Sequence, residues 1–205
     1  MRIFVIFFAL LNGGSSVLAQ LQPAAFDYSG VFELHEQGLS GQGVKIASVC
    51  RSETYIEGEP QNDYLWNLDH NCFYGGKITL SSDLGNISAH ATSIGGILAG
   101  FEKGVFLPEI GDFDYKGASF NAEIGIFEFW RFVSRYVTGE EELDADILTM
   151  SVGSVFEDWW TRGIERLAEK NGLVVVAGVG NGDDVYDPAY YPAAGGNVIG
   201  VGVID

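Results

Sequence analysis

The chain has 205 residues, 47% apolar and 19% charged, which is typical of a globular protein with a real core and not of a disordered chain. It carries 28 acidic and 11 basic residues, a net charge of −17. A non-specific nucleic-acid binder, or a protein that docks on anionic lipid, needs the opposite sign, so the charge argues against both classes. The 28 glycines show no Gly-X-Y period, which excludes collagen and predicts many tight turns.

The first 19 residues have the pattern of a secretory signal peptide. Met1-Arg2 supplies a positive charge, and the apolar run 3–11 is too short to span a bilayer. Val17-Leu18-Ala19 offers small residues at the two positions that a signal peptidase reads. We therefore expect cleavage after Ala19, a secreted or periplasmic mature chain, and no membrane span after signal removal. The alternative is a short hydrophobic N-terminal strand.

Two cysteines, Cys50 and Cys72, remain in the mature chain. Export permits a disulfide between them, which would close a loop of about 22 residues and stabilise the fold by about 3 kcal/mol. Two buried free thiols fit the sequence equally well, because cysteine is also a common core residue.

Residues 20–40 are predicted to form an N-terminal arm with a short helix over 31–37, ended by Gly38. Beyond the arm, apolar strands alternate with helical segments. Strands are predicted at 44–49, 122–127, 146–150, 173–177 and 197–203, and helices at 92–101, at 129–137, and from Trp160 to a stop at Asn171-Gly172. Several strands are apolar on both faces, which predicts an α/β fold with a parallel β-sheet flanked by helices on both faces.

In such sheets the functional residues lie at the carboxyl ends of the strands. These ends are predicted at Cys50-Arg51, at 151–154 and at 178–182. The segment Gly180-Asn-Gly182 is first of all a turn signal. The segment does not fit a dinucleotide-binding site, because it lacks the Gly-x-Gly-x-x-Gly spacing and no helix follows to receive the phosphates.

The three histidines have different settings. His35 lies in the arm and His70 in a polar stretch, and both are expected at the surface. His90 opens the helix that follows it, and small residues crowd the next turn. A histidine at a helix entrance is by itself more often structural than catalytic.

Taken in order, these segments resemble blocks of the subtilisin-like serine peptidases. Four blocks carry the resemblance. The strand that leads to the family's catalytic Asp resembles Gly41-Gln-Gly-Val-Lys-Ile-Ala-Ser-Val49, and the block around the catalytic His resembles His90-Ala-Thr-Ser-Ile-Gly-Gly. The block that lines the substrate cleft resembles Ala145-Asp-Ile-Leu-Thr-Met-Ser-Val-Gly-Ser154, and the strand that delivers the oxyanion-hole Asn resembles Gly172-Leu-Val-Val-Val-Ala-Gly-Val-Gly-Asn181. Residues 117–122 and 191–205 fit as well. The resemblance covers about Gly41 to Asp205, which we expect to be a partial peptidase domain, incomplete at its C-terminus.

The resemblance implies peptide-bond hydrolysis, with a peptide or protein as substrate. It implies that His90 is the general base and that Asn181 donates to the oxyanion. Ser151, Val152 and Gly153 would hold the substrate backbone as an added strand. The resemblance requires no cofactor.

The sequence departs from the family at two members of the catalytic triad. Cys50 stands at the Asp position, and Glu53 or Asp63 could replace that carboxylate only by a different loop path. The Gly-Thr-Ser-x-Ala block that carries the nucleophilic Ser is absent from this sequence, and Ala91 and Ser93 replace a Gly and a second His of the His block. We therefore expect the chain to be inactive alone, to expose apolar surface and to be marginally stable.

Several interpretations stay open. The chain is a portion of an exported subtilisin-like endopeptidase separated from its Ser-bearing part, a pseudoprotease that binds peptides without cutting them, or the product of a decayed gene. Cys50 favours the pseudoprotease. A weaker interpretation is an acidic module that binds structural calcium through Asp183, Asp184 and Asp187. The alternative for these three residues is an acidic turn that is simply exposed to solvent.

Overall fold

The structure is a computed structural model that describes residues 24–73, 77–80, 84–108, 111–156, 158–180 and 189–202. The expected signal peptide lies outside these ranges, as do Asn181, Asp183, Asp184 and Asp187. In the described part of the chain, no helix has the length and apolar character that a membrane span needs.

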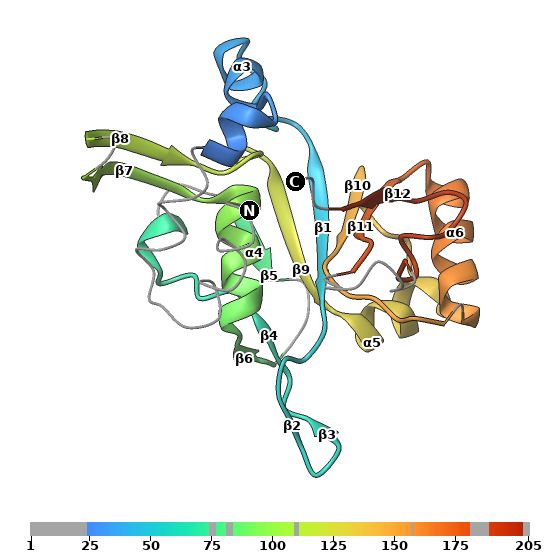
Figure 1. Cartoon of the computed structure of the whole chain (residues 1–205). Coiled ribbons are helices and arrows are strands. Elements are labelled where there is room, and N and C mark those ends of the chain that lie inside the picture. The colour runs from blue at the N-terminus through green and yellow to red at the C-terminus, as the bar shows by residue number, and fades with distance from the viewer. Residues whose placement is uncertain are drawn as a thin grey trace.

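A six-stranded parallel sheet forms the centre of the molecule, in the order β12-β11-β10-β1-β9-β5 (Figure 1). Its strands are β1 (Lys45–Cys50), β5 (Lys77–Leu80), β9 (Glu123–Glu128), β10 (Ile147–Met150), β11 (Val174–Gly178) and β12 (Ile199–Val201). The predicted parallel sheet and its five predicted strands are confirmed, and β5 adds an edge strand that the sequence analysis did not predict.

Helices and small ribbons surround this sheet. The helices are α3 (Val31–Glu36), η1 (Asn71–Phe73), α4 (Ala89–Ala99), α5 (Phe129–Phe132) with its π-helical continuation η2 (Val133–Val137), and α6 (Trp159–Asn171). Three two-stranded ribbons are β2 (Tyr55–Ile56) with β3 (Glu59–Pro60), β4 (Asp63–Leu65) with β6 (Asn86–Ile87), and β7 (Phe101–Leu107) with β8 (Gly111–Lys116). The predicted helices match α3, α4, α5 with η2, and α6.

Alternate strand residues face two separate cores. Ala47, Val49 and Leu148 pack with α5, η2 and α6 on one face of the sheet. Ile46 and Ile124 pack with α4 on the other face. Helices on both faces confirm the fold class, since a parallel sheet needs both faces covered.

Local sequence determines where helix α4 begins and how closely it packs. Ser88 is the N-cap, and its hydroxyl accepts a hydrogen bond from the Ala91 amide at 3.0 Å. Gly95 allows the close approach that the small residues predict, because a Cβ at this position would lie 2.4 Å from the Trp66 ring. The helix therefore presses against Trp66, a fully buried side chain in the segment after β4.

Two histidines expected at the surface are half-buried, which corrects that expectation. The arm folds back on the domain, so that His35 Nε2 bonds the Ala118 carbonyl at 3.1 Å and its ring meets the edge of Phe120. His70 Nδ1 lies 3.0 Å from Cys72 Sγ. Cys72 and Cys50 are both free thiols, so the open question of a disulfide is decided in favour of two buried thiols.

Candidate functional site

The carboxyl edge of the sheet gathers the residues that the sequence analysis singled out. Val49 of β1 pairs with Met150 of β10, so Cys50 and Ser151 follow at the same edge. Helix α4 begins at this edge and packs on the face to which Cys50 belongs. The ends of β1 and β10 and the start of α4, with His90 in its first turn, thus come together.

Cys50 cannot supply a negative charge at this edge. Its side chain is 1% exposed, and burial raises the pKa of the thiol to about 12, against the opposing effect of a hydrogen bond with Ser48. The group is therefore a neutral thiol at neutral pH. An orienting carboxylate, by contrast, stabilises the imidazolium that forms on the histidine during catalysis.

A carboxylate does reach the start of α4, and it comes from Glu53. Glu53 Oε2 accepts a 2.7 Å hydrogen bond from the Ser88 hydroxyl and lies 3.5 Å from the His90 backbone nitrogen, which donates to it. A negative charge at a helix N-terminus is stabilised by the unpaired amides and the helix dipole. The contact is to the backbone of His90, whose side chain is exposed.

Asp63 anchors the loop that carries Glu53. Its Oδ1 accepts from the amides of Glu53 and Thr54, each at 3.1 Å, and its Oδ2 accepts from Thr54 at 3.0 Å. Burial acts to raise the pKa of Asp63, but the hydrogen bonds from Thr54 and Glu53 outweigh it and hold the pKa below its usual value. The loop thus brings Glu53, not Asp63, to the start of α4, where Glu53 binds the Ser88 hydroxyl and the His90 amide.

The segment Ser151–Gly153 leaves β10 toward solvent. Ser151 is exposed, and Val152 and Gly153 are half-buried. Ser154 then forms an antiparallel bridge with Tyr191, with backbone bonds of 3.0 and 2.8 Å. The bridge thereby holds the segment Ser151–Ser154 at the same sheet edge as Cys50.

Tyr190 is a residue that sequence reasoning missed. A Cβ at Gly153 would lie 2.8 Å from the Tyr190 Cβ, and a Cβ at Gly180 would lie 3.4 Å from its ring. The tyrosine therefore packs between the predicted substrate strand and the turn that leads to Asn181. The glycines on both sides are visible in the sequence, but nothing in local spacing connects them with a tyrosine elsewhere in the chain.

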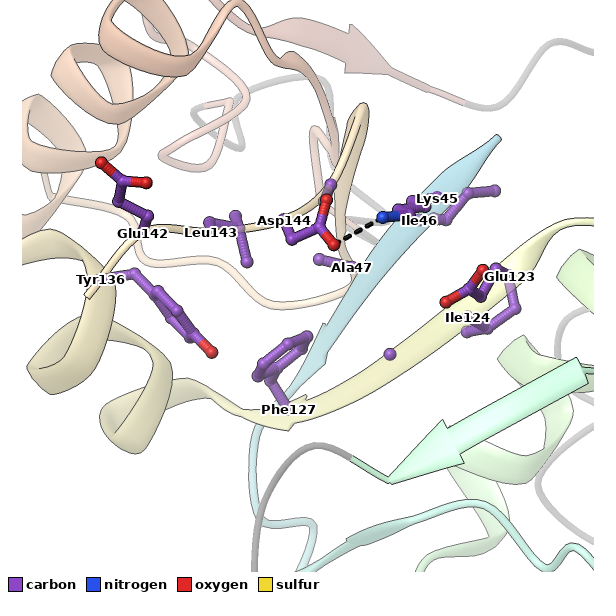
Figure 2. Close-up of a pocket in the computed structure, with 12 residues that line it drawn as sticks. Lys45, Ile46, Ala47, Glu123, Ile124, Phe127, Tyr136, Glu142, Leu143 and Asp144 are labelled. Carbon is purple, nitrogen blue, oxygen red and sulfur yellow. Dashed lines mark hydrogen bonds and ion pairs between the residues drawn. The ribbon is translucent and has the colours of Figure 1, made fainter. Parts of the chain in front are cut away.

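A pocket of about 220 Å³ opens at the opposite, amino edge of the sheet (Figure 2). Its floor is apolar, with Ala47, Phe127 and Leu143, and Lys45 pairs with Asp144 at its rim at 2.5 Å. It contains none of the predicted site residues. Among the residues that the structure describes, no three His, Cys, Asp or Glu side chains are grouped to hold a metal ion.

No family model matches the sequence, and no curated protein matches it. Solved structures do match. The prenylagaramide maturation protease PagA matches with a TM-score of 0.62 at 19% identity, over 86% of this chain and 59% of PagA. The PatG macrocyclase in complex with peptide matches with a TM-score of 0.55 at 15% identity, over 86% of this chain and 62% of PatG.

A third match is the psychrophilic subtilisin-like protease Apa1 from the Antarctic psychrotroph Pseudoalteromonas sp. AS-11. Its TM-score is 0.54 at 17% identity, over 77% of this chain and 35% of Apa1. The chain has the subtilisin-like fold. This subtilisin-like chain spans about three fifths of the length of PagA and PatG. The resemblance seen in the sequence blocks is thus confirmed at the level of the fold.

Proposed function

We propose that residues 41–205 are a portion of the catalytic domain of an exported subtilisin-like serine endopeptidase, and that this chain does not cut peptides on its own. Residues 1–19 would be the signal peptide and residues 20–40 the arm. The observation that carries the proposal is the meeting of the His90 helix start, the end of β1 at Cys50 and the strand Ser151–Gly153 at one edge of a subtilisin-like sheet.

Each residue has a role in this proposal. His90 is the general base, Asn181 the oxyanion donor, and Ser151, Val152 and Gly153 bind the substrate backbone as an added strand. The chain lacks the block that would bring the nucleophilic serine. The buried neutral thiol of Cys50 adds a second loss, because it leaves the His90 imidazolium without the family's carboxylate.

The alternative is a pseudoprotease that binds peptides without cleaving them. Cys50 favours this alternative, since separation from a serine-bearing part would by itself leave the Asp position unchanged. PatG, which has the same fold, is described in complex with a peptide. Peptide binding as an added strand needs accessible backbone groups along Ser151–Gly153 and no catalytic triad.

The activity test uses the 205-residue chain with labelled casein and a fluorophosphonate probe, which reacts with activated serines. We expect neither hydrolysis nor labelling above the level of a His90→Ala variant, with Ser93→Ala as a control on the same helix. Labelling that His90→Ala abolishes would contradict the proposal, because it would reveal a nucleophile within this chain.

The encoding DNA separates the two interpretations. A Gly-Thr-Ser-x-Ala block in any frame beyond codon 205 supports the peptidase. The lack of such a block, with a cysteine codon at position 50, favours the pseudoprotease or a gene in decay. Fluorescence polarisation with casein-derived peptides then tests binding, which a Ser151→Pro variant should weaken by removing a backbone donor.

A further inference from the structure

The pocket at the amino edge of the sheet (Figure 2) follows from the sizes of the side chains along β1 and β9. Alternate residues of the two strands face the same side of the sheet in three rows: Lys45 with Glu123, Ala47 with Gly125, and Val49 with Phe127. Successive rows are about 7 Å apart. The middle row carries a methyl group and a hydrogen atom only, so the sheet surface is hollow between a charged row and a large apolar row.

The inner end of this pocket is apolar and aromatic. Phe127 and Leu143 are 6% and 7% exposed, and both belong to the core beneath α5 and η2. Tyr136 extends from η2 toward Phe127, and the two rings meet edge to face with their centroids 5.6 Å apart (Figure 2). The pocket volume of about 220 Å³ is smaller than the ~300–1,000 Å³ that suits drug-sized ligands. The pocket therefore suits a small molecule with one flat apolar group.

The outer end of the pocket is acidic. Lys45 pairs with Asp144, and the exposed residues Glu123 and Glu142 also line the pocket. Three carboxylates and one ammonium group leave an excess of two negative charges. The hydrogen bond that Lys45 donates to Asp144 raises the pKa of Lys45, and the charges of Asp144 and Glu123 raise it further. The outer end thus favours positive charge beyond that of its own lysine.

We propose that this pocket binds a small aromatic amine, with its ring over Gly125 beside Phe127 and Tyr136 and its ammonium group at Glu123 and Asp144. The apolar floor selects the ring, and the acidic outer end selects the charge. A linker of two or three carbon atoms suits the spacing of about 7 Å between the middle row and the charged row. The net charge of −17 further attracts cationic ligands and repels anionic ones.

The test uses the full chain and 2-phenylethylamine, followed by nuclear magnetic resonance of the backbone amides. We expect saturable shifts at Gly125 and Leu143, which line the pocket. Ethylamine, which lacks the ring, should bind about tenfold or more weakly, because it buries no large apolar group. The neutral analogue 2-phenylethanol should bind about two- to fivefold more weakly, as expected for the loss of an exposed charge pair.

Substitutions in the charged row should act in opposite directions. Glu123→Gln should weaken binding of 2-phenylethylamine about two- to fivefold, and Lys45→Gln should strengthen it by a similar factor, because it removes a competing cation from Asp144. Gly125→Val fills the middle row and should weaken binding about tenfold or more. Glu57→Gln, an exposed change in the turn between β2 and β3, removes the same charge elsewhere and should have no effect.

Any of three results would overturn the proposal. The first is equal affinity for 2-phenylethylamine and either of its two analogues. The second is a folded Gly125→Val variant that binds as the native chain does. The third is a change of affinity in the same direction for Lys45→Gln and Glu123→Gln, which decides the matter even if circular dichroism shows that Gly125→Val does not fold. None of these results bears on the proposed peptidase function, because Cys50 and His90 lie at the opposite edge of the sheet.

Discussion

Cys50 shows how one residue changes the chemistry of the whole edge. It stands at the end of β1, where subtilisin-like peptidases carry the carboxylate that orients the catalytic histidine, and it is 1% exposed. A carboxylate at that point would favour a proton on His90 as catalysis proceeds, whereas a buried neutral thiol gives no such charge. The loss is local, because Cys50 fits the apolar core around it.

We expect the burial of this thiol to appear as pH-dependent stability. The pKa of Cys50 is about 12 in the folded chain and about 8.5 when unfolded, so the unfolded state loses its proton first as pH rises. The stabilisation is fully present below about pH 8.5 and is lost toward pH 12, with a slope of about 1.4 kcal/mol per pH unit. Between pH 8 and pH 10, urea unfolding should show a decline about 2 kcal/mol larger for the native chain than for Cys50→Ala. Equal declines would contradict a buried neutral thiol.

Glu53 is the second residue whose charge matters at this edge. Its carboxylate accepts from the Ser88 hydroxyl and the His90 amide at the start of α4. We expect Glu53→Gln to lower the free energy of unfolding by about 0.5–1 kcal/mol, because it removes a negative charge from a helix N-terminus. Glu57→Gln, in the exposed turn between β2 and β3, is the matched control and should have no measurable effect. Equal effects of the two substitutions in urea unfolding would show that the Glu53 contact contributes nothing.

At the scale of an element, α4 depends on one glycine and tolerates change at the next. A Cβ at Gly95 would lie 2.4 Å from the Trp66 ring, whereas the nearest atom to a Cβ at Gly96 is Cys72 Sγ at 3.6 Å. We expect Gly95→Ala to destabilise the chain by about 1–3 kcal/mol through overpacking, despite alanine's better helix propensity. Gly96→Ala should be neutral or stabilise by up to about 1 kcal/mol. A thermal unfolding series in which both variants behave alike would contradict the packing of α4 against Trp66.

The strands and helices of the central layer could be predicted because their signals are local. The run Val174–Gly178 is apolar throughout, and α6 ends where Asn171 is followed by Gly172, which adopts a φ of +66°. Helix α4 could be placed by its small residues, although it begins at Ala89, earlier than predicted. Each of these elements carries its pattern within a dozen residues.

The ribbon β7–β8 and the site contacts could not be predicted, because their partners are distant or weakly patterned. Within the described residues, the strand Phe101–Leu107 pairs only with Gly111–Lys116, and its polar residues interrupt the alternation expected of a half-buried strand. Glu53 reaches Ser88 across 35 positions. Tyr190 meets Gly153 through the fold of two loops. Local spacing contains no information on such contacts, which arise only when the sheet brings its strand ends together.

At the scale of the whole molecule, electrostatic self-repulsion is the dominant feature. The sequence has 28 acidic and 11 basic residues. In the described part of the chain, Lys45 pairs with Asp144 and Arg135 with Glu141, but both pairs are exposed and such pairs contribute little to stability. The excess negative charge therefore opposes the compact state, and salt that screens it should favour folding.

We accordingly expect the melting temperature to rise when NaCl increases from 0.01 M to 1 M, which shortens the Debye length from about 30 Å to about 3 Å. Each kcal/mol gained in the free energy of unfolding raises the melting temperature by about 2–4 °C in a chain of this size. Glu140→Lys combined with Glu142→Lys, two exposed changes in the acidic run before β10, reduces the net charge from −17 to −13. The variant should melt higher than the native chain at low salt and gain less from added NaCl. A native melting temperature that falls with salt, or a variant whose gain equals that of the native chain, would show that attractive ion pairs and not repulsion control the stability of this fold.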